Sequence, residues 1–193
     1  MKKFELTNEF ITNMFGTKLF RIRALVEFGD VEAGELGGYV EKESNLGHDD
    51  NAWVYDNAWV YGNARVYGDA QVSGDARVYD NAWVYGDALV YGNARVYGNA
   101  WVYGNALVCS DEDYAYAHGF GSVNRTTTFF RLKDGGVGVR CGCFYGTLAQ
   151  FRDKIRETHG ETKKAQEYLM LADLMELRFE EDENEVGNRK YVE

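Results

Sequence analysis

Four polar side chains in the C-terminal half of the chain have the types and spacing of an anion-binding site. An Asp-Gly-Gly turn signal separates two β-prone segments, RTTTFFRL and VGVRCGCF, which predicts a β-hairpin. Because side chains alternate across a strand, Arg125, Thr127 and Arg131 share one face of the first segment. Arg140 projects from one face of the second. Arginine forks bind phosphate and carboxylate groups, so these four residues are predicted to bind a small anionic, nucleotide-like molecule.

A glycine-containing loop from Gly119 to Ser122 precedes this hairpin, and its backbone N–H groups would add donors for the same anion. The alternative interpretation is an ordinary solvated hairpin whose arginines pair with the acidic C-terminal tail, residues 181–193. The sequence is compatible with both.

Two cysteines in the second segment are the other candidates for chemistry. Cys141 and Cys143 alternate onto one strand face, where both sulfurs would reach one metal ion together with His118 or His159. Their spacing is not that of the usual zinc knuckle, which leaves about two to four residues between its cysteines. We therefore expect buried thiols that pack under helices, and neither a metal nor a cofactor. With Cys109 the chain has three cysteines, too few for a disulfide framework.

These segments must be positioned by the long repeat that precedes them. From Asn51 to Ser110 a six-residue unit is written ten times in succession. Such a fixed short period indicates that each unit packs mainly on its own copies. The units are NAWVYD, NAWVYG, NARVYG, DAQVSG, DARVYD, NAWVYG, DALVYG, NARVYG, NAWVYG and NALVCS.

A period of six predicts strands rather than helices. Six is a multiple of the strand period of two but not of the helical period of 3.6, so the Val of each unit keeps to one face only in a strand. Ala and Val are therefore predicted to point inward, while Gly-Asn and Gly-Asp pairs form corners. Three units close a triangular coil of 18 residues. With a first coil that begins near Tyr39, the chain is predicted to form about four coils of a parallel β-helix.

Residues eighteen positions apart lie above one another in such a helix, which gives each face a defined composition. Two faces stack tyrosines beside tryptophans and arginines, whereas the third carries mixed side chains such as Gln71, Leu89 and Leu107. Stacked rings can simply stabilise the coils. Tyr, Trp and Arg are also the residues that dominate protein interfaces, so we expect self-association, with a homotrimer favoured. The predicted interface residues are Trp59, Tyr61, Tyr79, Tyr97, Tyr67, Trp83, Tyr85, Trp101 and Tyr103.

Four regions are expected along the chain. Residues 1–38 form a strand-containing N-terminal cap, 39–110 the hexapeptide-repeat β-helix, 111–180 a β-hairpin with two helices, and 181–193 the acidic tail. Thr147 is predicted to cap a helix that continues to about His159, with Gly160 as its C-cap. A second helix is expected from Glu161 to Phe179. The fold class is therefore mainly β with a C-terminal α+β appendage.

Composition excludes some classes of partner. The net charge is −10, and only residues 111–156 are mildly basic, so general nucleic-acid binding is not expected. There is no signal peptide and no long apolar span, and cysteines are few, so the sequence predicts a cytoplasmic protein that does not bind membranes.

The repeat resembles that of the hexapeptide-repeat, left-handed parallel β-helix family. The flanking sequences LGGYVEKESNLGHDDNAWVYDNA and TTTFFRLKDGGVGVRCGCFYGTLAQF, followed by RETHG, are most similar to small hexapeptide-repeat proteins of phages and prophages. The resemblance implies left-handed coils and, if the chain is phage-encoded, a location in the host cytoplasm. Acyltransferases of the family carry a catalytic His on a loop that leaves the coils. Here the spacing from Leu46 to Val54 is eight instead of six, so a bulge forms near His48, the candidate general base.

Three functions follow from these patterns. The favoured one is a non-enzymatic, oligomeric binding protein, a phage accessory factor that inhibits or sequesters a component of host defence. The second is a binder of a small anionic ligand through the hairpin arginines. The third is a hexapeptide acyltransferase that uses His48. No motif assigns catalytic residues, so a non-enzymatic protein is expected.

Overall fold

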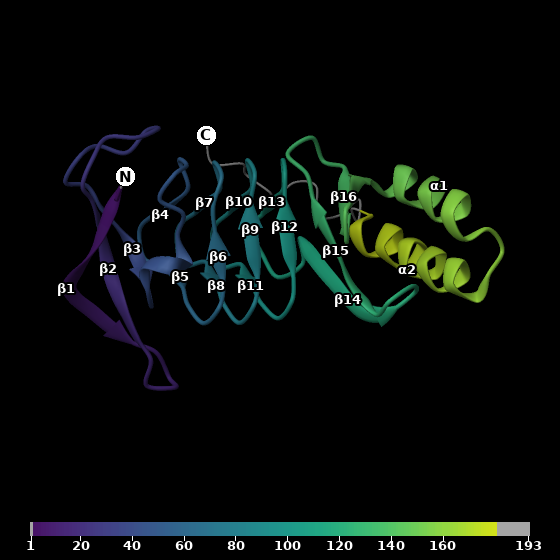
Figure 1. Cartoon of the computed structure of the whole chain (residues 1–193), viewed down its shortest axis with the longest axis horizontal. Helices are drawn as coiled ribbons and strands as arrows, with labels where there is room; N and C mark the ends of the chain where they lie inside the picture. Colours follow the sequence, from purple (N-terminus) through teal and green to yellow (C-terminus); the bar gives the residue numbers. More distant parts are fainter. Residues whose placement is uncertain (1, 181–193) are drawn as a thin grey trace.

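The computed structural model describes residues 2–180, which form three parts along one long axis (Figure 1). An N-terminal β-hairpin lies at one end, a stack of short coils in the middle, and an antiparallel sheet with two helices at the other end. The predicted acidic tail, residues 181–193, lies outside the described residues. The strands and helices are β1 (Phe4–Thr12), β2 (Lys18–Ala24), β3 (Leu36–Val40), the 3₁₀ turn η1 (Glu43–Asn45), β4 (Trp53–Val54), β5 (Trp59–Val60), β6 (Arg65–Val66), β7 (Gln71–Val72), β8 (Arg77–Val78), β9 (Trp83–Tyr85), β10 (Leu89–Val90), β11 (Arg95–Val96), β12 (Trp101–Tyr103), β13 (Leu107–Val108), β14 (Tyr114–Phe120), β15 (Arg125–Arg131), β16 (Val137–Cys141), β17 (Phe144–Thr147), α1 (Leu148–His159) and α2 (Lys163–Phe179).

The central coils form the predicted parallel β-solenoid with three faces. We call them face A (β5, β8, β11), face B (β6, β9, β12) and face C (β4, β7, β10, β13). Strands pair in parallel at a spacing of eighteen residues, as in Trp59↔Arg77 and Val60↔Val78. Face C stacks four strands, which corresponds to about four coils. The prediction from the six-residue period is therefore confirmed.

The interior of the solenoid is built from the two small side chains of each unit. Every Ala and Val at the second and fourth positions of the ten units is fully buried. The corners are tight: at Gly62, with φ +69°, a Cβ would lie 3.1 Å from the backbone nitrogen of Asp80 in the next coil. Glycine adopts this backbone angle without strain, while Asp56 and Asp80 hold the same position of their units with φ of +52° and +60°.

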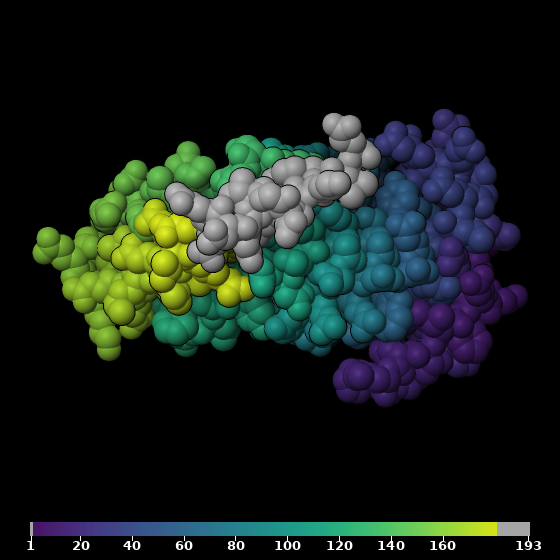
Figure 2. Space-filling view, turned by 180° about the vertical axis from the view of Figure 1, so that it is seen from behind, coloured from purple at the N-terminus to yellow at the C-terminus, as the bar shows by residue number. Residues whose placement is uncertain are grey.

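The N-terminal region extends face A beyond the first coil. Strands β1, β2 and β3 pair antiparallel, and β3 pairs in parallel with β5 through Tyr39↔Trp59, which confirms a start of the coils near Tyr39. The bridge between Leu46 and Val66 spans twenty residues, so the two extra residues bulge at the corner as expected. The β1–β2 hairpin projects from the body of the molecule (Figures 1 and 2).

One inward–outward prediction in the first coil is wrong. The repeat places Trp53 between the inward Ala52 and Val54, at a position predicted to face outward, but its side chain is fully buried. The rings of Phe4 and Phe28 pack against it at 6.2 and 5.3 Å between centroids. Because the N-terminal region folds over this end of face C, an outward position of the repeat becomes an inner one.

The C-terminal region is a four-stranded antiparallel sheet rather than a single hairpin. The predicted hairpin is present as β15 and β16, but β14 and β17 pair on either side of it. The segment VGVRCGCF, expected as one strand, turns at Gly142, where φ is +59°, and returns as β17. Glycine at the first position of a two-residue turn is typical of a type II′ hairpin.

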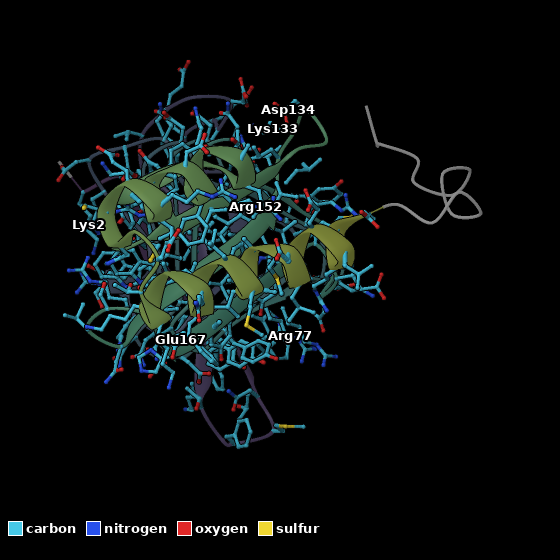
Figure 3. The ribbon with its side chains drawn as sticks, turned by 90° about the vertical axis from the view of Figure 1, so that its right-hand side faces the viewer. Lys2, Arg77, Lys133, Asp134, Arg152 and Glu167 are labelled. Atoms are coloured by element: carbon cyan, nitrogen blue, oxygen red, sulfur yellow. The ribbon has the colours of Figure 1, made fainter. Side chains whose placement is uncertain are left out.

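This sheet separates the solenoid from the helices. Phe130, on one face of β15, belongs to the buried cluster of the solenoid, whereas Phe129 and Val139 pack with the helices. Thr147 caps α1 as predicted, and α2 begins at Lys163 with Thr162 as its N-cap rather than at Glu161. Viewed from the helix end, Arg152 of α1 lies between the two helices (Figure 3), where it binds Asp173 and Glu176 of α2. Within residues 2–180 no helix is both long and apolar enough to cross a lipid bilayer.

Candidate functional site

Face A carries a column of stacked side chains. The rings of Tyr61 and Tyr79 stack at 5.1 Å between centroids, and those of Tyr79 and Tyr97 at 5.3 Å. Beside this column the Arg77 guanidinium lies 4.2 Å from the centroid of the Trp59 ring. The side chains align because equivalent positions of successive coils are about 4.8 Å apart, which is close to the distance between the centroids of two stacked rings.

Face B carries a second set of columns. Tyr67 and Tyr85 stack at 4.8 Å, and Trp83 and Trp101 stack at 5.2 Å with an interplanar angle of 8°. Arginines lie at both ends of the tryptophan column. Arg65 lies 5.7 Å from the Trp83 ring, and Arg140 of β16 lies 5.5 Å from the Trp101 ring. The second cation comes from the C-terminal sheet, not from the repeat.

All nine predicted interface residues lie on these two faces, and their side chains are partly exposed. We call this region the aromatic–arginine surface. It consists of Trp59, Tyr61, Arg77, Tyr79, Arg95 and Tyr97 on face A and of Arg65, Tyr67, Trp83, Tyr85, Trp101, Tyr103 and Arg140 on face B. Its placement is as predicted, whereas its role as an interface stays a prediction.

Burial favours the neutral form of four tyrosines of this surface. Burial raises the pKa of Tyr67 to about 12, with a smaller contribution from Tyr85 beside it. Burial also raises the pKa of Tyr61, Tyr79 and Tyr85 above the ordinary value. The charge of the surface therefore comes from its arginines.

These arginines lack acidic partners. Among residues 2–180 no carboxylate forms an ion pair with Arg65, Arg77 or Arg95. Elsewhere in the same chain arginines are paired, as Arg23 is with Glu5. The guanidinium groups on the two adjoining faces can therefore form ion pairs with acidic groups of a partner.

The structure does not bring the four predicted ligand residues together. Thr127 and Arg131 lie on the helix-facing side of the sheet, where the Arg131 Nε is 3.2 Å from the Asp113 carboxylate. Arg140 pairs with Thr128, so it lies on the opposite side, over face B. Arg140 would lie on the same side of the sheet as Arg125, Thr127 and Arg131 only if it paired with an odd-numbered residue of β15. The pairing register of β15 and β16 decides this, and the sequence does not predict that register.

Arg125 instead lines an open groove between face B and the end of the C-terminal sheet. The groove has a volume of about 500 Å³ and is lined by Asn99, Trp101, His118, Arg125, Thr126 and Gly142. Of these residues, the sequence predicted Arg125 as an anion ligand and offered His118 as a metal ligand. The recurrence of Asn63, Asn81 and Asn99 at eighteen-residue spacing was the signal that could have added the asparagine.

The other candidates for chemistry have structural contacts. His48 accepts a hydrogen bond at Nδ1 from the Lys3 N–H at 3.3 Å, and its ring stacks on Phe4 at 4.3 Å. It is part of the N-terminal cap, and its Nδ1 lone pair is occupied.

The cysteines are separated as well. Cys141 accepts a hydrogen bond from the Thr127 hydroxyl at 3.1 Å, while Cys143 is exposed in the β16–β17 turn. The expected burial is met only in part by Cys141, which packs partly buried against the helix cluster, and it fails for Cys143, because the strand ends before it. In the described part of the chain no three His, Cys, Asp or Glu side chains are grouped to hold a metal ion.

Comparison with known proteins supports the solenoid and is limited to it. Residues 58–74, 70–86, 82–98 and 88–104 match the YdcK β-solenoid repeat. No curated protein matches the chain. The matched segments all lie within the coils of faces A, B and C, so the chain is a β-solenoid repeat protein that is similar to the YdcK repeat over residues 58–104.

Proposed function

We propose that this chain is a non-enzymatic binding protein that assembles with copies of itself through the aromatic–arginine surface. The observation that carries the proposal is the set of half-buried Trp and Tyr side chains on two adjoining faces, interleaved with arginines that have no described carboxylate partner. Large apolar patches on soluble proteins usually mark binding surfaces, and Trp, Tyr and Arg supply most of the binding energy at protein interfaces.

The shape and composition of the surface support a protein partner. A shallow groove of about 340 Å³ beside Arg65, Tyr67 and Trp83 would accept a side chain from the partner. At the positions that hold exposed Trp or Arg on the other faces, face C has the buried Trp53 and then Gln71, Leu89 and Leu107. We therefore assign the contact to faces A and B and expect a closed oligomer, with the trimer of the sequence prediction as the favoured state.

The partner outside the oligomer is a component of host defence in this proposal. That part is supported only by the resemblance of the flanking sequences to small phage and prophage proteins.

The test is the molar mass in solution, measured by light scattering. We expect a multiple of the chain mass of 21.9 kDa for the wild type. The double variant Arg65→Glu/Arg77→Glu should fall toward the monomer mass, because it reverses charge on both faces without touching the interior. Gln71→Glu introduces the same acid on face C and should leave the mass unchanged. A monomeric wild type would refute the self-association, and the surface would then be tested for a different protein partner.

A further inference from the structure

We propose that the groove at the junction of the solenoid and the C-terminal sheet binds a phosphomonoester. The site differs from the four-residue site expected from the sequence, and it does not depend on the oligomer proposed above. Its lining residues come from separate elements, a corner and strand of the solenoid, β14–β15 and the β16–β17 turn, which only the folded chain brings together.

Arg125 is the cation of this groove. Its guanidinium lies against the turn at Gly142, where any Cβ would collide with Nη1. The turn therefore holds the guanidinium in place through a residue that has no side chain. No carboxylate lines the groove, and none in residues 2–180 forms an ion pair with Arg125. The five N–H donors of this arginine are available to an anion.

Asn99 adds a directed donor. The Nδ2 of Asn63 donates to the Oδ1 of Asn81 at 3.1 Å, and the Nδ2 of Asn81 donates to the Oδ1 of Asn99 at 3.3 Å. This chain of amides runs along one corner of the solenoid toward the C-terminal sheet. It ends at the groove, where no described residue accepts a hydrogen bond from the Asn99 Nδ2. Each amide polarises the next, so the last N–H is the strongest donor of the row.

Thr126 and His118 complete the polar wall. The His118 Nδ1 and the Thr126 hydroxyl are 3.0 Å apart on neighbouring strands. With the imidazole N–H donating to its oxygen, the threonine hydroxyl can give its own proton to a ligand. Trp101 supplies the apolar wall, because its ring faces are occupied by Trp83 and Arg140 and its edge borders the groove.

The arrangement selects the class of ligand. A guanidinium, an amide and a hydroxyl line the same groove from separate elements, and this number of donors suits a group with three terminal oxygens better than a carboxylate with two. The volume of about 500 Å³ lies in the range of small-molecule sites and leaves room for the ester group beside Trp101. A phosphomonoester fits both the donors and the apolar wall.

Calorimetric titration of the full-length chain tests the site, with inorganic phosphate, ribose 5-phosphate, AMP and adenosine as probes. The phosphate-bearing probes should bind and adenosine should not. Arg125→Ala should weaken binding by about tenfold or more, the usual loss for a charge-assisted hydrogen bond. Absence of binding by all three phosphate-bearing probes would overturn the proposal.

Asn99→Asp is the sharper variant. The new carboxylate can still accept the hydrogen bond from Asn81, so the row of amides is kept while its last donor becomes an anion. It should abolish phosphate binding, whereas Asn57→Asp, the same change at an exposed corner outside the groove, should leave binding unchanged. Equal loss in both variants would contradict the site. So would binding that survives Arg125→Ala but is lost in Arg77→Ala. Light scattering on the same samples separates these results from a failure to oligomerise.

Discussion

The two ends of the solenoid are closed by opposite chemistry. Successive coils pair as parallel strands, in which hydrogen bonds run both ways: the Trp53 N–H donates to the Ala70 carbonyl at 3.1 Å, and N–H groups of the following coil donate back. Each end of the solenoid is therefore left with both carbonyls and N–H groups that need partners. At the N-terminal end a buried lysine donates to two carbonyls, whereas at the C-terminal end a buried carboxylate accepts from two N–H groups.

At the N-terminal end the cation is Lys3. Its side chain is only 4% exposed. The Nζ donates to the carbonyls of Asp50 at 2.6 Å and Ala52 at 2.8 Å, and it lies 4.5 Å from the centre of the Phe28 ring.

At the C-terminal end the acceptor is Asp113. One carboxylate oxygen accepts from the backbone N–H groups of Cys109 and Ser110, both at 2.9 Å. The other lies 3.2 Å from the Arg131 Nε.

The two ends of the solenoid therefore carry chemically different caps, although its interior is the same in every coil. Every coil presents the same Ala and Val core, so any coil can stack on any other. The caps are not interchangeable, because a lysine cannot accept the N–H groups of the last coil and a carboxylate cannot donate to the carbonyls of the first. The following changes test whether each end depends on the chemistry assigned to it.

Asp113→Ala should have the largest effect. It removes the acceptor of two backbone N–H groups and leaves the charge of Arg131 buried with a lost partner, which costs about 3–5 kcal/mol in the free energy of unfolding. Urea denaturation measures the change. Asp111→Ala is the matched control, since Asp111 is exposed and, among residues 2–180, its carboxylate accepts a hydrogen bond from the Arg95 backbone N–H alone. Similar losses in the two variants would show that the buried pair does not close the end.

Lys3→Met should have the next largest effect. Methionine keeps most of the apolar stem but offers no donor to the two carbonyls, which predicts a loss of about 1–3 kcal/mol in the free energy of unfolding. The exposed neighbour Lys2 provides the control variant Lys2→Met, for which little change is expected. If the two methionine variants are equally stable, the lysine is not the cap.

Thr128→Val should have a smaller effect at the C-terminal end. The Thr128 hydroxyl accepts from the Trp101 N–H of the last coil at 3.0 Å, and this single hydrogen bond is worth about 1 kcal/mol. Thr126→Val on the same strand is the control, because the Thr126 hydroxyl bonds to His118 and not to the solenoid. Equal denaturation midpoints for the two variants would argue against this contact as a cap.

Local signals predicted the parts of the fold that repeat or carry caps. The six-residue period gave the strands, the inward Ala and Val and the stacked columns, and Thr147 and Gly160 gave the bounds of α1. These features depend on residues that are close in sequence or that recur at a fixed spacing. They need no knowledge of how distant segments dock.

The parts that the sequence did not predict depend on such docking. Trp53 is buried by Phe4 and Phe28, which are far from it in sequence. Arg140 and Arg131 lie on opposite sides because of the β15–β16 register, and the groove exists because the C-terminal sheet packs on the last coil. The two charged caps were not predicted for the same reason, because no sequence pattern near Lys3 identifies the distant backbone carbonyls to which it donates.

Lys3 of the N-terminal cap and Tyr67 of the face B column should change the free energy of unfolding with pH in opposite directions. Burial lowers the pKa of Lys3 below its ordinary value of 10.5, although Asp50 opposes the shift. In the window between the folded and unfolded values the unfolded chain binds the extra proton, so raising the pH through that window stabilises the folded state. The pKa of Tyr67 is raised from 10.0 to about 12, and its contribution has the opposite sign. Stability from Tyr67 is present below pH 10 and is lost as the pH rises toward 12.

Urea denaturation from about pH 8 to about pH 11 measures both effects. The difference in the free energy of unfolding between the wild type and a variant removes the contribution of the titrating groups that both proteins have. The advantage of the wild type over Lys3→Met should grow as the pH approaches 10.5, since a neutral amine still donates to both carbonyls and no longer requires a buried charge. Tyr67→Phe should instead flatten the loss of stability above pH 10. An advantage of the wild type that shrinks toward alkaline pH would mean that the N-terminal end needs the charge of Lys3, through Asp50, more than it needs its donors.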